Sequence, residues 1–117
     1  MRMWNVKPSL MCTQHLLGEH LEMHMFVGSI NNNKKIEGFI RNGLVETNYI
    51  KSRHDEIVAE FDRRGYDHKT LLEYNDQINR GKVDTQHSLK VLAERCPKCR
   101  ELQERYYGKG KSTGHCS

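Results

Sequence analysis

The stretch QHLLGEHLEMHM, residues 14–25, decides how the chain is expected to fold. Its spacing is helical and few residues that break helices interrupt it, so we predict a helix from Ser9 to about Val27. Gly18 costs this helix up to about 1 kcal/mol relative to alanine, and it leaves room for another backbone or a ligand to approach. Four apolar side chains share one face, which is predicted to seat the helix in the core: Leu10, Leu17, Leu21 and Met25.

A second face of the same helix carries titratable groups. His15, Glu19 and Glu22 are spaced four and three residues apart, in line with Phe26. Such a stripe is either a solvated polar surface or a site of acid–base catalysis, because a carboxylate on a half-buried helix face has a raised pKa and transfers protons near neutral pH. Both interpretations remain open at this point.

A third interpretation is a metal site at His20 and His24, which are four residues apart. This pair would suit a zinc-dependent hydrolase. However, the zinc-protease motif has glutamate directly after its first histidine, and here Leu21 stands in that place.

The segments before and after this helix complete an all-α prediction. Residues 1–8 form a short N-terminal arm, and KKIEGFIRNGL predicts a short amphipathic helix that ends at Asn42-Gly43. We expect Thr47 or Asn48 to cap a second long helix, which Gly65 ends. Its apolar stripe is expected to comprise Tyr49, Ile50, Ile57, Val58 and Phe61.

The C-terminal third begins with a long loop and is otherwise expected to be helical. Asp84 or Thr85 caps a helix that Pro97 kinks or restarts, and Gly108 begins a flexible basic tail, residues 108–117. No β-alternation of useful length and no internal repeat occurs. We therefore predict one compact all-α domain over 1–117, a bundle of about three main helices.

Composition limits the class of protein and of partner. The 117 residues are 36% apolar and carry a net charge of +4, which suits DNA or is ordinary surface charge. No apolar run approaches the length of a membrane span, and the N-terminus lacks the apolar stretch of a signal peptide. We expect an intracellular, cytoplasmic protein whose four cysteines are thiols or metal ligands rather than disulfides.

Motifs in several parts of the chain, taken in order, resemble one known family. Arg2 is the second residue of the arm, and the first helix carries QHL..E..E, Gln14 to Glu22, followed by FVG at 26–28. The middle helix contains SRHDEIVAEFDRRGY, and YYGK at 106–109 stands near the C-terminus. The chain is similar to the pyrimidine-dimer DNA glycosylases, repair enzymes of the phage endonuclease V type.

The resemblance implies an all-helical enzyme that excises a damaged or modified pyrimidine from double-stranded DNA and then nicks the abasic strand. It implies that the nucleophile is the N-terminal α-amine, here that of Met1, and that the essential carboxylate is Glu22. We expect Met1 to be retained, because Arg2 is too large for removal of an initiator methionine.

The chemistry that the resemblance implies is consistent with ordinary acid–base properties. An α-amine has a pKa of roughly 7.7–8.0, so about one in ten is unprotonated at pH 7, against about one in 2,500 for a lysine. Its attack on C1′ gives a Schiff base, and Glu22 relays the C2′ proton for β-elimination. No cofactor is needed, and the enzyme is expected to act as a monomer.

Further residues are expected to contact DNA. Arg2 would bind phosphate or the extruded nucleotide, and His15 and Glu19 would lie beside it. The aromatic pair at 106–107 would either stack on bases or pack in the core. The remaining candidates are Lys34, Lys35, Arg53, Tyr106, Tyr107 and Lys109, within a broader basic set that includes Arg41, Lys51, Arg63, Arg64, Arg105 and Lys111.

The sequence departs from the family pattern at the helix and near the C-terminus. Leu21 and Met25 occupy positions where the family has arginines, and residues 103–105 lack its aromatic cluster. A non-catalytic DNA-binding protein of the same fold is therefore an alternative, and a lesion other than the cyclobutane dimer is open.

The cysteines form a separate feature. CPKC, Cys96 to Cys99, has the spacing of a zinc knuckle but supplies only two ligands. A second pair would be Cys12 with His15, or the tail residues His115 and Cys116. A structural zinc that joins the last helix to the first and reduced, unliganded thiols are both open. The cysteines considered as zinc ligands are Cys12, Cys96, Cys99 and Cys116.

Overall fold

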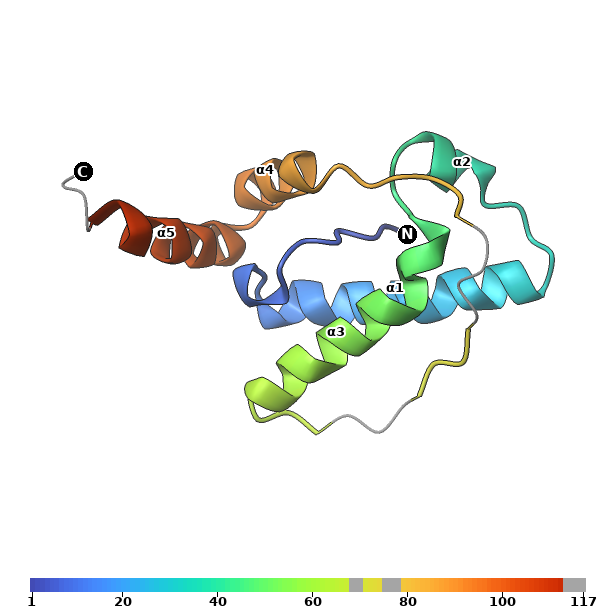
Figure 1. Cartoon of the computed structure of the whole chain (residues 1–117), viewed down its shortest axis with the longest axis horizontal. Coiled ribbons are helices and arrows are strands. Elements are labelled where there is room, and N and C mark those ends of the chain that lie inside the picture. Colours follow the sequence, from blue (N-terminus) through green and yellow to red (C-terminus); the bar gives the residue numbers. More distant parts are fainter. Residues whose placement is uncertain (68–70, 75–78, 113–117) are drawn as a thin grey trace.

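The computed structural model describes residues 1–67, 71–74 and 79–112, and it describes side chains as far as Gly108. Figure 1 shows an irregular N-terminal arm followed by helices. The bounds are η1 Pro8–Leu10, α1 Thr13–Asn31, α2 Glu37–Arg41, η2 Thr47–Tyr49, α3 Ile50–Arg63, α4 Thr85–Arg95 and α5 Pro97–Ser112, where η denotes a 3₁₀ turn. No strand occurs in the described ranges, and the all-α prediction is confirmed.

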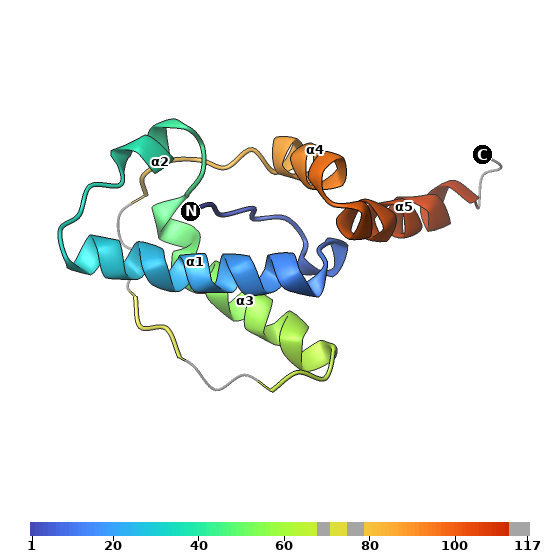
Figure 2. The same cartoon turned by 180° about the vertical axis from the view of Figure 1, so that it is seen from behind.

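Helices α1 and α3 cross and pack against each other at the centre of the molecule. Figure 2 shows the N-terminal arm running between α1 and α4, so that the chain end lies inside the helical array. The arm is anchored by apolar side chains, since Met3, Trp4 and Val6 are all buried. An extended segment without helical hydrogen bonds is thereby held in place by burial of its side chains.

The core consists of two apolar clusters. One contains Leu16 of α1 and Ile57 of α3, and the other contains Met23 and Ile50 of the same two helices. Between the two clusters, each helix carries one buried charged residue, Glu19 on α1 and Arg53 on α3. The two parts of the core therefore meet at a polar layer.

The buried face of α1 differs from the predicted one. Leu17, Leu21 and Met25 are 48%, 58% and 54% exposed, so the leucine face does not seat the helix. The buried side chains of α1 are instead Leu16, Glu19, His20, Met23, Phe26 and Val27. The prediction was wrong because Glu19 and His20 lie in the interior, where Glu19 pairs with Arg53 and the His20 ring contacts those of His24 and His54.

Helix ends were predicted with mixed success. Asp84 caps α4 as expected, because its carboxylate accepts a hydrogen bond from the His87 backbone N–H. Thr47 does not cap α3: its hydroxyl accepts from the Arg80 backbone N–H, and η2 precedes the helix. Gly65 follows α3 with a φ of +87°, a left-handed conformation that glycine adopts without strain.

Helices α4 and α5 form the C-terminal part, and α5 extends away from the rest of the molecule (Figure 1). Pro97 is the first residue of α5, so it restarts the helix after α4 rather than kinking one helix. The expected tail does not begin at Gly108, because α5 continues to Ser112; residues 113–117 lie outside the described residues. None of the described helices is long and apolar enough to cross a membrane.

Candidate active site

The inner part of the site is an ion pair that links three segments of the chain. Arg53 of α3 donates from Nε to Glu19 Oε2 over 2.7 Å and from Nη2 to Oε1 over 2.8 Å. The backbone N–H groups of Trp4 and Asn5 also donate to Oε2, over 2.9 and 3.2 Å. One carboxylate on α1 thus holds both α3 and the N-terminal arm.

Burial alone would lower the pKa of Arg53, but the hydrogen bonds and charge of Glu19 outweigh it, and the pKa is raised. Both side chains of the pair are 0% exposed. Glu19 and Arg53 were predicted to contact DNA, but the structure places both side chains in the interior, where each has partners within the protein. Their role is to fix the path of the arm.

Glu22, one helical turn further along α1, holds the first peptide of the arm. The backbone N–H of Arg2 donates to Glu22 Oε1 over 2.5 Å. Since covalent geometry limits the separation of successive backbone nitrogens, the Met1 nitrogen lies no more than about 6 Å from that oxygen. Met3 N–H donates to Leu44 O over 2.7 Å and fixes the other side of the arm.

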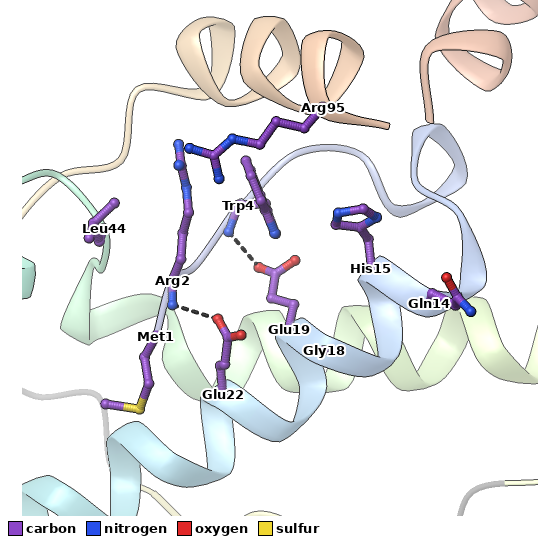
Figure 3. Close-up of a pocket in the computed structure, with 10 residues that line it drawn as sticks. All are labelled: Met1, Arg2, Trp4, Gln14, His15, Gly18, Glu19, Glu22, Leu44 and Arg95. Atoms are coloured by element: carbon purple, nitrogen blue, oxygen red, sulfur yellow. Dashed lines mark hydrogen bonds between the residues drawn. The ribbon is translucent and has the colours of Figure 1, made fainter. Parts of the chain in front are cut away.

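These residues line an open pocket of about 590 Å³, which is within the usual range for ligand sites. Figure 3 shows the Glu22 carboxylate and the chain end at one side, with Gly18 between the glutamate and His15. A Cβ built on Gly18 meets nothing within 4 Å, so this part of the wall is open. The complete lining is Met1, Arg2, Trp4, Gln14, His15, Gly18, Glu19, Glu22, Leu44 and Arg95.

Two guanidinium groups lie on the same side of the pocket (Figure 3). Arg2 stacks on the Trp4 ring, with its Cζ 4.0 Å from the ring centroid. Burial and, next, the charge of Arg95 lower the pKa of Arg2, while Glu22 raises it. Two like charges so placed favour an anion between them, and phosphate is the anion that paired guanidinium groups bind well.

Arg95 and Trp4 were not among the predicted site residues. Arg95 is the last residue of α4, far in sequence from the arm, and no local motif marks it. Trp4 looked like an apolar residue of a short arm. Its position one residue before the turn at Asn5, whose φ is +55°, is visible only in the structure.

The structure separates the other predicted DNA contacts. His15 is half-buried, and its Nδ1 faces thiols: it lies 3.2 Å from Cys12 Sγ and 3.6 Å from Cys99 Sγ. Lys34 and Lys35 are exposed in the loop after α1 and do not line the pocket.

The tyrosine pair lies on α5, outside the pocket lining. Tyr106 and Tyr107 are 48% and 47% exposed, with their ring centroids 5.1 Å apart, so they are not core residues. The Lys7 ammonium lies 4.8 Å from the Tyr106 ring centroid. The side chains of Lys109 and Lys111 lie outside the described part of the chain, and so does Cys116.

Several other basic residues of the expected DNA track are engaged within the protein. Arg64 donates to the carbonyl oxygens of Pro8 and Met11 and to Glu60 Oε2. Arg63 also pairs with Glu60. Arg64 holds the end of α3 against η1, which leaves it less available to phosphate, whereas the Arg63 side chain is exposed.

His20 and His24 lie next to a third histidine, His54 of α3. Their ring centroids are 4.8 to 5.0 Å apart, and one ligand atom from each lies within 4.8 Å of the others. The predicted pair thus gains a partner that the sequence did not indicate. However, none of the three lines the pocket that Met1 and Glu22 share, which gives a zinc-dependent hydrolase no support from this geometry.

Comparison with protein families places this geometry in context. The model of one family, Pyrimidine dimer DNA glycosylase, matches residues 1–74. The chain belongs to this family. The match contains the arm, α1, α2 and α3, and therefore every residue of the pocket lining except Arg95. Comparisons with curated proteins and with solved structures returned no match.

The family name implies DNA glycosylase activity, a role in DNA repair and a DNA substrate. Leu21 and Met25, where the resemblance leads us to expect arginines, carry exposed apolar side chains on α1. Around the pocket of this pyrimidine dimer DNA glycosylase family member, Arg2 and Arg95 instead supply the positive charge.

Proposed function

We propose that this protein excises a damaged or modified pyrimidine by attack of the Met1 α-amine on C1′ and then cuts the abasic strand by β-elimination with Glu22. The observation that supports it most is the short distance, at most about 6 Å, between the Met1 nitrogen and a Glu22 oxygen in an open pocket. A nucleotide extruded from the duplex would enter this pocket.

The first half of the reaction removes the base. The α-amine forms a bond to C1′, the bond from C1′ to the base breaks, and the base leaves with a proton. Glu22 takes a proton from the nitrogen and passes it to the ring oxygen as the C1′–O4′ bond opens, which leaves a protonated imine. Glu22 is then a carboxylate again.

The second half cuts the strand. Glu22 takes a proton from C2′, which the imine acidifies, and the bond from C3′ to the phosphate oxygen breaks. The 3′ phosphate leaves and an unsaturated sugar remains on the amine. Water hydrolyses the imine and regenerates the free Met1 amine.

The charges that line the pocket suit both halves of the reaction. Arg2 and Arg95 lie where they would bind phosphates that flank the extruded nucleotide, and the stack of Arg2 on Trp4 fixes one of these charges. Because the Glu19–Arg53 pair neutralises its own charges, Glu22 is the carboxylate of α1 that remains for proton transfer.

Reductive trapping tests this proposal. Intact mass first establishes that the chain carries a free Met1 amine. The protein is then incubated with abasic duplex DNA and sodium cyanoborohydride, and the cross-linked peptide is mapped by mass spectrometry. We expect a single adduct on the Met1 nitrogen, because the imine is reduced to a stable amine before hydrolysis.

Glu22→Gln is the test variant and Glu37→Gln is its control, since both glutamates lie on helices. Glu22→Gln is expected to slow strand cutting, while Glu37→Gln, exposed on α2, leaves it unchanged. An adduct on Lys7, or none on any residue, would overturn the proposal. Binding of duplex DNA without an adduct would identify a non-catalytic member of the same family.

A further inference from the structure

Four potential metal ligands from opposite ends of the chain meet beside the pocket. Cys12, His15, Cys96 and Cys99 each offer one ligand atom, and these atoms all lie within 4.8 Å of one another. They come from two short motifs, C-x-x-H and C-x-x-C, which are separated by most of the sequence. The fold brings the two motifs together, which their positions in the sequence alone do not predict.

The distances within this cluster fit a tetrahedral zinc site. With Zn–S bonds of about 2.3 Å and a Zn–N bond of about 2.0–2.1 Å, two sulfurs of a regular tetrahedron lie about 3.8 Å apart and a sulfur and a nitrogen about 3.6 Å apart. Cys12 Sγ lies 3.8 Å from Cys96 Sγ. His15 Nδ1 lies 3.2 Å from Cys12 Sγ and 3.6 Å from Cys99 Sγ.

The two motifs occupy equivalent places on two helices. Cys12 directly precedes α1 and His15 is in its first turn, while Cys96 directly precedes α5 and Cys99 is in its first turn. Two helix N-termini therefore point at the cluster, and their partial positive charge favours the net negative charge of a zinc ion with three thiolates.

Backbone N–H groups supply hydrogen bonds to the sulfurs. The Cys12 N–H donates to Cys99 Sγ over 3.3 Å, and the Cys99 N–H lies 3.5 Å from Cys96 Sγ. Such bonds orient the ligands and stabilise thiolates around a bound metal. Cys12 and Cys99 are buried in the first apolar cluster, which shields the site from water.

We propose that Cys12, His15, Cys96 and Cys99 bind one structural zinc ion. All four positions of the tetrahedron are taken by protein, so the ion has no open position and takes no part in base excision. Cys12 with His15 is the first of the two pairs considered from the sequence, and the tail residues of the other lie outside the described part of the chain. The family match ends at residue 74, so half of this site lies outside it.

The ion would join α5 to the start of α1 and would fix a wall of the pocket. His15 lines the pocket, and Trp4 packs edge-on against its ring at a centroid distance of 6.0 Å. Zinc binding therefore stabilises the side of the pocket opposite Met1. This inference does not depend on the proposed reaction, because its tests measure metal content and folding.

Metal analysis of the full-length protein provides the first test. Protein purified without added chelator is expected to contain about one equivalent of zinc, and Cys96→Ser and His15→Gln are each expected to lose it. The matched controls are Cys116→Ser and His20→Gln, which should retain it. Retention of the metal by His15→Gln, or its loss from either control, would overturn the assignment of ligands.

Cobalt substitution and thermal unfolding test the native protein, so they apply even when a ligand variant folds poorly. Co²⁺ added to the metal-free protein should give the intense thiolate charge-transfer and visible bands of a tetrahedral site. Removal of zinc with a chelator should lower the Tm, and one equivalent of zinc should restore it. Protein that holds no zinc, and in which added Co²⁺ gives no thiolate bands, would overturn the proposal.

Discussion

Glu19 and Glu22 stand one turn apart on the same side of α1, but their surroundings differ. Glu19 lies under the arm, where Arg53 and two backbone N–H groups occupy both of its oxygens. Glu22 lies at the pocket, where one oxygen accepts from the Arg2 backbone N–H. Both residues line the pocket, but the carboxylate of the first is bonded to Arg53 and the arm and has no exposed surface, whereas that of the second lies beside the chain end.

The difference comes from a partner on another helix. Helical spacing puts both carboxylates on one face, but only the fold decides that Arg53 of α3 pairs with the first and that the N-terminal peptide lies against the second. Loss of Glu19 should therefore affect stability, and loss of Glu22 should affect activity.

Glu22→Gln is expected to lower the rate of strand cutting on abasic DNA by about 100- to 10,000-fold, the usual contribution of a general acid–base group. The amide keeps a carbonyl oxygen that accepts from the Arg2 N–H, so the arm should stay in place. Single-turnover kinetics measure the rate, and thermal unfolding serves as the control. A variant that cuts at the native rate would break the comparison.

Glu19→Gln is expected to destabilise the fold by about 3–5 kcal/mol, because it leaves the buried Arg53 charge with only the half-exposed Glu56 as a counter-charge. In a domain of this size the Tm should fall by roughly 10 °C or more. Chemical denaturation measures the change. The double variant Glu19→Leu with Arg53→Met should recover part of the loss, and a single variant as stable as the native protein would contradict the sealed-pair interpretation.

Arg95→Gln is expected to weaken DNA binding about tenfold or more, since it removes a charged phosphate contact. The slope of log K against log salt should fall in magnitude by about one. Fluorescence anisotropy over a range of salt concentrations measures both quantities. The control is Arg100→Gln on α5, which lies outside the pocket lining and should leave the salt slope as it is.

Acid should unfold the protein partly through Glu60, a second carboxylate held by arginines. Its pKa is lowered by hydrogen bonds from Arg63 and Arg64, which outweigh the opposing effect of burial. The ion pairs therefore contribute their full stability above the ordinary glutamate pKa, and this contribution is lost as the pH falls through the lowered value. Urea unfolding across this pH range should be less pH-dependent for Glu60→Gln; an unchanged dependence would contradict the mechanism.

Gly18 lies where α1 lines the pocket, and its substitution is expected to have the smallest effect on stability. Gly18→Ala should raise stability by up to about 1 kcal/mol, because an added Cβ meets nothing and alanine favours helix. Gly18→Leu should fill the pocket wall and reduce activity, whereas Gly28→Leu, also with free space but outside the lining, should not. Equal activity of the two leucine variants would place the nucleotide elsewhere.

The sequence predicted the helical class better than the packing. Met1, Arg2 and Glu22 lie together in the structure, as the resemblance to the family led us to expect. Asp84 was predicted as a cap because its signal is local. Helix type and caps depend on a few neighbouring residues, which is the range over which sequence patterns are informative.

The failures involve contacts between distant segments. Hydrophobicity predicted that Leu17 and Leu21 face the core, yet the buried partners of Glu19 made the polar face the inner one. Arg53 was counted as a surface charge for the same reason. Arg95 joined the pocket only because α4 packs over the arm (Figure 3), and no pattern in one helix reports that.

Besides its buried side chains, the arm is held through its peptide groups, and this has a consequence for what can be changed at its first residue. Four successive amides, those of residues 2–5, are tied to α1 or to Leu44. Exchanging the side chain of residue 1 leaves every one of these bonds intact. Lengthening the chain by a single residue ahead of Met1, as an uncleaved affinity tag does, moves the terminal nitrogen away from Glu22. Position 1 should therefore tolerate a change of side chain but not the addition of residues ahead of it.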